Sequence, residues 1–216
     1  MIKHATASAF VFCEFPQGWR LGLIEHPRLH KRMIVGGHVE CDETQAEAAV
    51  REAAEESGLV VWLLTAPSPA LPPGYPHERV AAPWWITEVM VPADNHVSEP
   101  HVHVDHQYVA IADSPVPVSE PAQPFGWFSV EELADLPMFE DTLLLARALF
   151  PRIGSLAAAA ERDGEDLSGE RMSGAQRRSP PISQTREFLS TPAGAWRSNR
   201  PLGTHSSRVS TATMTR

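Results

Sequence analysis

The sequence predicts an α/β domain followed by a C-terminal tail that has no core of its own. Up to residue 151, segments rich in Val, Phe, Trp and other strand formers alternate with turn residues, which predicts a sheet. Residues 44–57 carry small apolar side chains at helical spacing, which predicts a helix packed closely on that sheet. After Pro151 the chain becomes rich in Ser, Arg, Pro, Gly and Thr. We therefore expect one folded domain over residues 1–151 and a disordered tail over 152–216.

The strand signals lie at regular places along the first 151 residues. The first two are joined by the turn Pro16-Gln17-Gly18, which predicts a hairpin. A connection over residues 65–83 contains too many prolines for a central strand or a helix, and loops of this length are often functional. The predicted strands are 5–15, 19–25, 59–64, 84–91, 101–109 and 125–128, and two further helices are predicted at 139–150 and 153–161.

The ends of the main helix have their own sequence signals. Thr44 followed by Glu47 fits a capping box, and Gly58 fits the left-handed residue that ends a helix. The face predicted to pack on the sheet consists of Ala46, Ala49, Val50 and Ala53.

The other face of this helix is unusually rich in carboxylates. Glu52, Glu55 and Glu56 stand at i, i+3 and i+4, so they project from one face within a turn and repel one another. Arg51 can reach Glu55 at i+4 or Glu47 at i−4, but one cation cannot neutralise the group. A divalent cation is the expected missing partner.

These residues resemble the signature of the Nudix hydrolase family, which runs from a glycine through a glutamate and an Arg-Glu pair to a Glu-Glu pair and a closing glycine. The stretch fills every fixed position and has Ala53 and Leu59 at the two apolar ones, although Val35 stands where a proline often precedes the glycines. A solvated glutamate face is the alternative interpretation, which the flanking glycines and Arg51 argue against. The matching fixed residues are Gly37, Glu43, Arg51, Glu52, Glu55, Glu56 and Gly58. With a Gly-Trp-Phe-Ser passage at 126–129, the resemblance covers residues 5–151.

The resemblance implies an α/β/α sandwich with a mixed sheet. It also implies metal-dependent hydrolysis of the pyrophosphate bond of a nucleoside diphosphate linked to another moiety, with Mg²⁺ or Mn²⁺ as cofactor. By this resemblance the metal ligands are Glu52, Glu55 and Glu56 together with a backbone carbonyl of Gly36 or Gly37.

The same resemblance suggests roles for the remaining residues of the signature. Arg51, Glu52 and Glu55 are the expected catalytic residues: Arg51 orients the glutamates, and Glu43 supports them. The general base is left between Glu52 and Glu99, which lies outside the signature. A nucleoside triphosphate, an ADP-sugar and a dinucleoside polyphosphate all remain open as substrates.

Some residues outside the signature are candidates for substrate contacts. A basic loop over 26–32 holds Arg28, Lys31 and Arg32, which either bind substrate phosphate or are merely solvated. Trp84 either stacks on a base or packs in the core, and the second interpretation is favoured.

Histidines gather in the segment 101–106. His101, His103 and Asp105 alternate onto one side of a predicted strand, which could bind a metal, but zinc needs a fourth ligand that the spacing does not supply. Simple hydrogen bonding of these histidines is the favoured alternative. A role near the substrate is also open for His103, Asp105 and His106.

Charge and composition limit the function classes. The net charge of −9 divides into −13 for residues 1–151 and +4 for residues 152–216, and an acidic body does not suit nonspecific duplex binding. Two cysteines are too few for a disulfide framework, which favours the cytoplasm, and no apolar run approaches the ~20 residues of a membrane span.

A non-catalytic Nudix-fold sensor of a nucleotide or ADP-sugar, with the basic tail on DNA, is the alternative function. A homodimer is left open.

Overall fold

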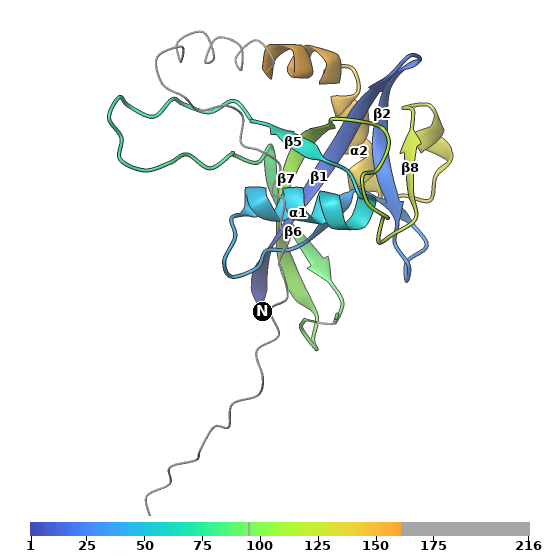
Figure 1. Cartoon of the computed structure of the whole chain (residues 1–216). Coiled ribbons are helices and arrows are strands. Elements are labelled where there is room, and N and C mark those ends of the chain that lie inside the picture. Colours follow the sequence, from blue (N-terminus) through green and yellow to red (C-terminus); the bar gives the residue numbers. More distant parts are fainter. Residues whose placement is uncertain (95, 161–216) are drawn as a thin grey trace, which may run out of the picture. The chain divides into compact units, whose positions relative to one another are not determined.

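Two long strands form the middle of one mixed sheet in the computed structural model, which describes residues 1–94 and 96–160. β1 (Lys3–Phe15) and β7 (His101–Ala112) run parallel, with Lys3 opposite Val102 and Phe12 opposite Ile111 (Figure 1). β2 (Gly18–Glu25) returns antiparallel to β1 through the predicted hairpin. The other strands are β3 (Arg32–Met33), β4 (Val35–His38), β5 (Val61–Leu64), β6 (Trp85–Val91) and β8 (Phe125–Phe128).

The remaining pairings place β4 and β6 beside the two central strands. The continuous strand order is β3-β2-β1-β7-β5, and β4, β6 and β8 pair with β1, β7 and β2 respectively. The helices are α1 (Gln45–Ser57), α2 (Glu140–Leu149) and the short 3-10 helix η1 (Glu132–Asp135). β4 leads directly into the loop before α1, so this pairing positions the helix over the sheet.

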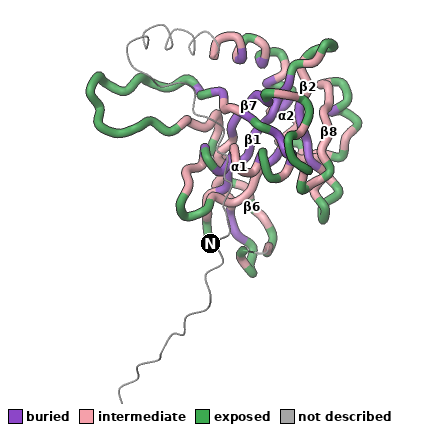
Figure 2. Tube along the Cα trace, viewed as in Figure 1, coloured by how far each residue is buried: buried purple, intermediate pink, exposed green. Residues whose placement is uncertain are grey.

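α1 packs on one face of the sheet and α2 on the other, and successive residues of β1 point to these opposite sides. Odd-numbered residues such as Ala9 and Val11 pack with Ala49 and Ala53 of α1. Even-numbered residues on the other face pack with α2, and the rings of Phe12 and Phe150 lie 5.2 Å apart. The resulting α/β/α sandwich confirms the predicted fold class, and the buried residues lie between its layers (Figure 2).

The predicted strands and helices are present, but the prediction lacked β3 and β4. The sequence places residues 26–32 in a loop and assigns Gly36 and Gly37 only to the start of the signature, whereas both glycines are paired strand residues opposite Ser8 and Ala7. Glycine carries no strand signal of its own. Strand β4 lies so close to β1 at Gly36 that a Cβ there would be 2.7 Å from the carbonyl oxygen of Ala7.

The chain stays packed on the sheet beyond residue 151. The predicted helix over 153–161 is present as a helix over residues 153–160. Ile153 and Ala157 are buried in the same core as α2. Of the tail predicted to be disordered over residues 152–216, residues 161–216 lie outside the described residues.

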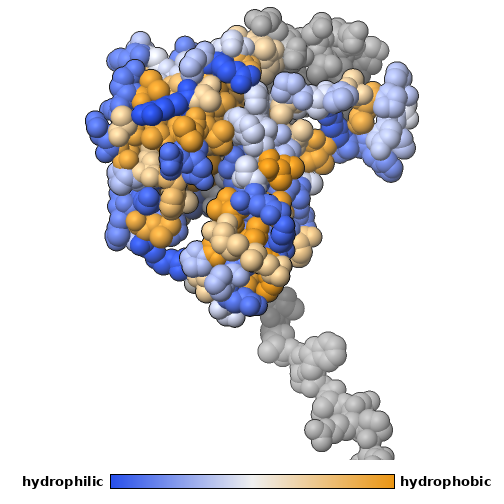
Figure 3. All heavy atoms as spheres, turned by 180° about the vertical axis from the view of Figure 1, so that it is seen from behind, coloured by the Kyte–Doolittle hydropathy of each residue, from blue (hydrophilic) through white to orange (hydrophobic). Residues whose placement is uncertain are grey.

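The connection between β5 and β6 leaves the sheet as a long exposed loop (Figures 1 and 2). Seen from behind, the surface mixes hydrophilic and hydrophobic residues (Figure 3). Exposed apolar side chains include Ile86 and Met90 of strand β6, which are 59% and 58% exposed.

Among the described residues, each helix alone falls short of the length and apolar character that crossing a membrane requires. Only α2 taken together with residues 153–160 reaches that limit by length and composition, and this pair is bent by 62°.

Candidate active site

Helix α1 begins and ends where its sequence signals predict. The Thr44 hydroxyl accepts a hydrogen bond from the Glu47 N–H at 3.2 Å, and the Glu47 carboxylate accepts one from the Thr44 N–H at 2.8 Å. At the other end Gly58 is left-handed, with φ of 69°, and its N–H donates to Ala54 at 3.0 Å. These caps fix which residues of α1 turn toward β4.

Arg51 connects the carboxylates of the signature. Its Nε and Nη2 atoms donate to the two oxygens of Glu43 at 3.0 and 2.7 Å, in a bidentate pair. Nη1 donates to Glu52 at 2.8 Å and to Glu55 at 3.2 Å. Nη2 also donates to the His38 carbonyl at 3.0 Å, which joins the helix to β4. Of the two partners open to Arg51 in the sequence, Glu55 is therefore the one used, while Glu47 serves the helix cap.

Two of the glutamates lie against the glycine pair of β4. The Gly36 N–H donates to Glu56 at 3.0 Å. A Cβ on Gly37 would lie 2.3 Å from a carboxylate oxygen of Glu52, so only glycine permits this approach. Of the predicted ligands of α1, Glu52 and Glu56 are thus brought against β4, whereas Glu55 lies on the outer side with 59% of its side chain exposed.

The electrostatics of this cluster follow from burial and from the single arginine. Hydrogen bonding to Arg51 lowers the pKa of Glu43, and the hydrogen bond with Glu43 raises the pKa of Arg51. Burial raises the pKa of Glu52 although Arg51 opposes the rise. Burial also raises the pKa of Glu56 to about 7, and the charges of Glu52 and Glu55 add to it. The cluster therefore holds more negative charge than Arg51 can balance.

The donor set suits a hard divalent cation. Carboxylate oxygens are among the ligands that Mg²⁺ and Mn²⁺ prefer, and α1 places the carboxylates of Glu52 and Glu56 against the glycine pair of β4. Burial is the main cause of the raised pKa of Glu56, and a cation would relieve the repulsion by Glu52 and Glu55 that adds to it. The assignment of Glu52, Glu55, Glu56 and a carbonyl of the glycine pair as the ligands of such an ion stays a prediction.

The basic loop lies near the segment that leads to α2. Lys31 Nζ donates to the Met138 carbonyl at 3.3 Å and lies over the Phe139 ring at 4.2 Å. Arg32 pairs with Glu25 at 3.0 Å. Arg28 is exposed. A role for these three cations in phosphate binding stays a prediction.

Trp84 and Glu99 have different surroundings. The Trp84 indole N–H donates to the Leu64 carbonyl at 2.7 Å, and its ring packs against the core on the α2 side. This packing is the interpretation that the sequence favoured. Glu99 is exposed, and its carbonyl oxygen lies 2.9 Å from Nδ1 of His101. Its role as a general base stays a prediction.

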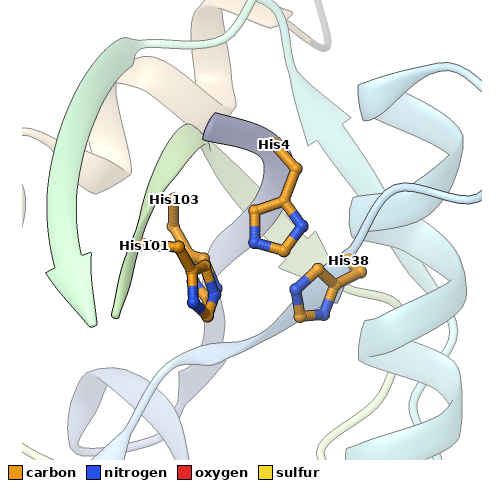
Figure 4. Close-up of side chains that lie close together, drawn as sticks. All are labelled: His4, His38, His101 and His103. Carbon is orange, nitrogen blue, oxygen red and sulfur yellow. The ribbon is translucent and has the colours of Figure 1, made fainter. Parts of the chain in front are cut away.

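The histidine segment contributes to a cluster that the spacing did not reveal. His101 and His103 do share one side of β7, but Asp105 does not join them, because it accepts hydrogen bonds from Thr6 at 2.9 Å and Ser8 at 2.7 Å. His4 of β1 and His38 of β4 lie beside them instead (Figure 4).

These two partners are distant in the sequence, so only the strand register brings them in. His4 is paired with His103, and His38 is paired with Thr6, two residues along β1 from His4. The available sequence signal was weak: a histidine at an alternating position of the first strand and another directly after Gly37.

A model of the NUDIX domain matches residues 3–147, and the chain belongs to the Nudix family. A hydrolase of the NUDIX family from Clostridium perfringens is 24% identical, with a TM-score of 0.52 over 71% of this chain and 99% of that chain, a likeness of fold. An Ap4A hydrolase from C. elegans is 15% identical, with a TM-score of 0.46 over 68% and 95% of the two chains. The NUDIX domain of Shewanella oneidensis NrtR, complexed with ADP ribose, is 18% identical, with a TM-score of 0.41 over 71% and 90%. No curated protein matches the sequence.

Proposed function

We propose that this protein hydrolyses the pyrophosphate bond of a nucleoside diphosphate linked to another moiety, with Mg²⁺ or Mn²⁺ as cofactor. The observation that carries the proposal is the set of half-buried carboxylates that α1 holds against the glycine pair of β4, with one arginine to balance them. Membership of the Nudix family supports it. A helix that merely faced solvent would have no reason to place charged groups where burial disfavours them.

The contacts of each residue in the carboxylate cluster suggest a different role for it, as a metal ligand or as a group that positions the ligands. Glu52, Glu55 and Glu56 are the proposed ligands, and a bound divalent cation supplies charge neutralisation for the phosphates and a more acidic water. Arg51 fixes the orientation of Glu52 by a hydrogen bond of 2.8 Å. Glu43 holds Arg51 in place through its two hydrogen bonds, so its role is to position the others.

The general base is proposed to be Glu52, with Glu99 as second choice. Glu52 lies beside Gly37 and keeps one carboxylate oxygen that makes no hydrogen bond with Arg51. Burial raises its pKa, which strengthens it as a proton acceptor near neutral pH.

The test is release of phosphate and pyrophosphate from nucleoside triphosphates, ADP-sugars and dinucleoside polyphosphates with Mg²⁺ or Mn²⁺. Glu56→Gln keeps an acceptor for the Gly36 N–H but loses the charge that holds the cation. We expect turnover of one substrate class to fall by about 10²–10⁴-fold, the usual scale for a lost electrostatic or acid–base contribution.

Glu47→Gln is the matched control, because it lies on the same helix and glutamine also serves in a capping box. Its turnover should stay near that of the wild type. Near-normal turnover in Glu56→Gln would contradict the ligand assignment. Substrates that raise the melting temperature without being cleaved would favour the non-catalytic sensor instead.

A further inference from the structure

We propose that His4, His38, His101 and His103 form a second metal site, separate from the carboxylates and selective for a divalent transition-metal ion such as Zn²⁺. One nitrogen from each ring lies within 4.8 Å of those of the other three. The rings come from three neighbouring strands and point toward one another (Figure 4). This proposal does not depend on the proposed hydrolase activity.

The strand register puts all four side chains on one side of the sheet. His4 and His103 are direct partners in the parallel pair of β1 and β7, and His101 follows at an alternating position. His38 is opposite Thr6, which shares the side of His4. Ala7 and Gly37, which face α1, point the other way, so the histidines lie on the opposite side of the sheet from the carboxylate cluster.

The hydrogen bonds within the described residues leave nitrogen atoms without partners. Nε2 of His4 and Nε2 of His38 are buried and have no hydrogen-bond partner there. Nε2 of His101 and Nε2 of His103 lie 3.1 Å apart. An unpaired buried polar atom destabilises the folded protein, so an ion shared by the four rings would remove this penalty at His4 and His38.

The geometry is close to that of a tetrahedral zinc site. Zinc–nitrogen bonds of ~2.0–2.1 Å require nitrogens about 3.3 Å apart in a tetrahedron. The His101–His103 distance of 3.1 Å already meets this value. The other pairs are no wider than 4.8 Å, so small ring rotations would complete the set.

The surroundings match what histidine ligands need. Nδ1 of the fully buried His101 lies 2.9 Å from the Glu99 carbonyl, an arrangement that fixes a ligating ring by its other N–H. Burial lowers the pKa values of His4 and His103, and it lowers that of His38 to about 4, with His96, His103 and His4 adding to the effect. Burial thus favours the neutral imidazole of His4, His38 and His103, and neutral imidazole is the form that binds metal.

Asp94 supplies the negative charge that four neutral ligands lack. Its Oδ2 lies 3.4 Å from Nε2 of His101, 3.7 Å from Nε2 of His103 and 3.9 Å from Nε2 of His38. Its other oxygen accepts hydrogen bonds from the backbone N–H groups of His96 and Val97 at 2.7 and 2.8 Å, which holds the carboxylate toward the rings. Four imidazoles favour zinc, copper or nickel over Mg²⁺, which prefers oxygen.

Such an ion would connect β4 to β1 and β7 near the carboxylate cluster. The backbone of His38 accepts the hydrogen bond from Arg51, and Gly36 and Gly37 precede it in the same strand. Four protein ligands leave no open position, as in structural zinc sites. We therefore assign the ion a structural role, in which it holds the strand that the carboxylates contact.

The test measures zinc in the untagged full-length protein. After removal of metal with a chelator, the protein is incubated with Zn²⁺, separated from free ion, and analysed for metal content and melting temperature. We expect about one tightly held zinc ion per chain and a raised melting temperature, with no similar rise in Mg²⁺.

Variants locate the ion. Zinc affinity should fall more than about 100-fold in His4→Ala and in His103→Ala. It should fall about 10-fold in Asp94→Asn, because the amide no longer offsets the charge of the ion. His77→Ala, which changes an exposed histidine outside the cluster, is the matched control. The triple variant Glu52→Gln, Glu55→Gln, Glu56→Gln should keep the zinc.

Two outcomes would overturn the proposal. Wild-type protein that fails to retain zinc would do so, as would zinc that is lost from the triple glutamine variant but kept in His4→Ala. If a histidine variant does not fold, X-ray absorption of the zinc-loaded wild type decides, because it counts imidazole ligands directly. Any shell other than four nitrogen ligands would contradict the assignment.

Discussion

Glu56 shows how the fold controls the charge of a single residue. It projects from α1 toward β4, where one backbone N–H is its hydrogen-bond partner. Burial raises its pKa to about 7, and the nearby Glu52 and Glu55 carboxylates add to the rise. In the metal-free protein the folded state therefore favours the protonated form of this side chain.

This raised pKa predicts a pH-dependent stability of the metal-free protein. Because the pKa rises from 4.5 to about 7 on folding, the contribution to stability is complete below pH 4.5 and is lost as the pH rises through 7. Glu56→Gln lacks this titration. We compare the two proteins after a chelator has removed any metal. At pH 8 the free energy of unfolding of Glu56→Gln should exceed that of the wild type by on the order of 2–3 kcal/mol. Near pH 4.5 the two values should be the same.

Urea unfolding of both proteins at the two pH values measures this difference. The histidines titrate in both the wild type and Glu56→Gln, so their contribution cancels in the difference between the two free energies of unfolding. Mg²⁺ should restore much of the stability of the wild type at pH 8, because it balances the ionised carboxylates. A difference between the two proteins that does not change with pH would contradict the raised pKa.

Arg51 shows how one side chain can organise several carboxylates. Its guanidinium donates to Glu43, Glu52 and Glu55 and to the His38 carbonyl. A lysine has a single charged nitrogen and cannot reproduce this planar fork. This contact explains why an arginine directly precedes a glutamate in the signature, because Arg51 donates a hydrogen bond to Glu52.

At the scale of elements, the position of α1 depends on its C-terminal glycine. Gly58 has φ of 69°, and a Cβ there would lie 2.2 Å from the carbonyl oxygen of Ser119. The N–H of Val118 also donates to the Gly58 carbonyl at 2.8 Å. This turn thus joins the end of α1 to the segment before β8.

Gly58→Ala should destabilise the protein for two reasons, and one control separates them. Gly74 has a similar φ of 78° but nothing within 4 Å of its Cβ position. Gly74→Ala should cost about 1–2 kcal/mol for the left-handed backbone alone. Gly58→Ala should cost clearly more in thermal unfolding, because Ser119 must move. Equal costs for the two variants would show that the contact with Ser119 is unimportant.

At the scale of the whole molecule, the helix over residues 153–160 completes the core beside α2. Ile153 is fully buried and Ala157 is 6% exposed. Both pack with Leu149 on the side of the sheet opposite α1. The residues directly after Pro151 therefore contribute to the stability of the domain.

Ile153→Ala in the full-length chain should lower the free energy of unfolding by about 2–5 kcal/mol, the range for removing a buried aliphatic side chain. Leu144→Ala is the matched control, because Leu144 is on α2 but 60% exposed. Its effect should stay near 0.5 kcal/mol or below. Chemical denaturation measures both, and similar losses in the two variants would contradict the packing of residue 153.

The sequence by itself determined the elements whose causes are local. Helix α1 begins at the Thr44 cap and ends at Gly58 as predicted, because caps and helical spacing act within a few residues. Glu52 and Glu56, which turn toward β4, were also predicted to share one face of the helix, because i and i+4 positions do so in any helix. Most strands were predicted from their apolar residues.

The tertiary structure alone decided features that depend on strand register. Gly36 and Gly37 became strand residues because they fit closely against β1 and Glu52, a contact without a local signal. His4, His38 and His103 are far apart in the chain and meet because β4 and β7 both pair with β1. Local propensity cannot predict such meetings, since they arise from hydrogen bonding between strands that are distant in the sequence.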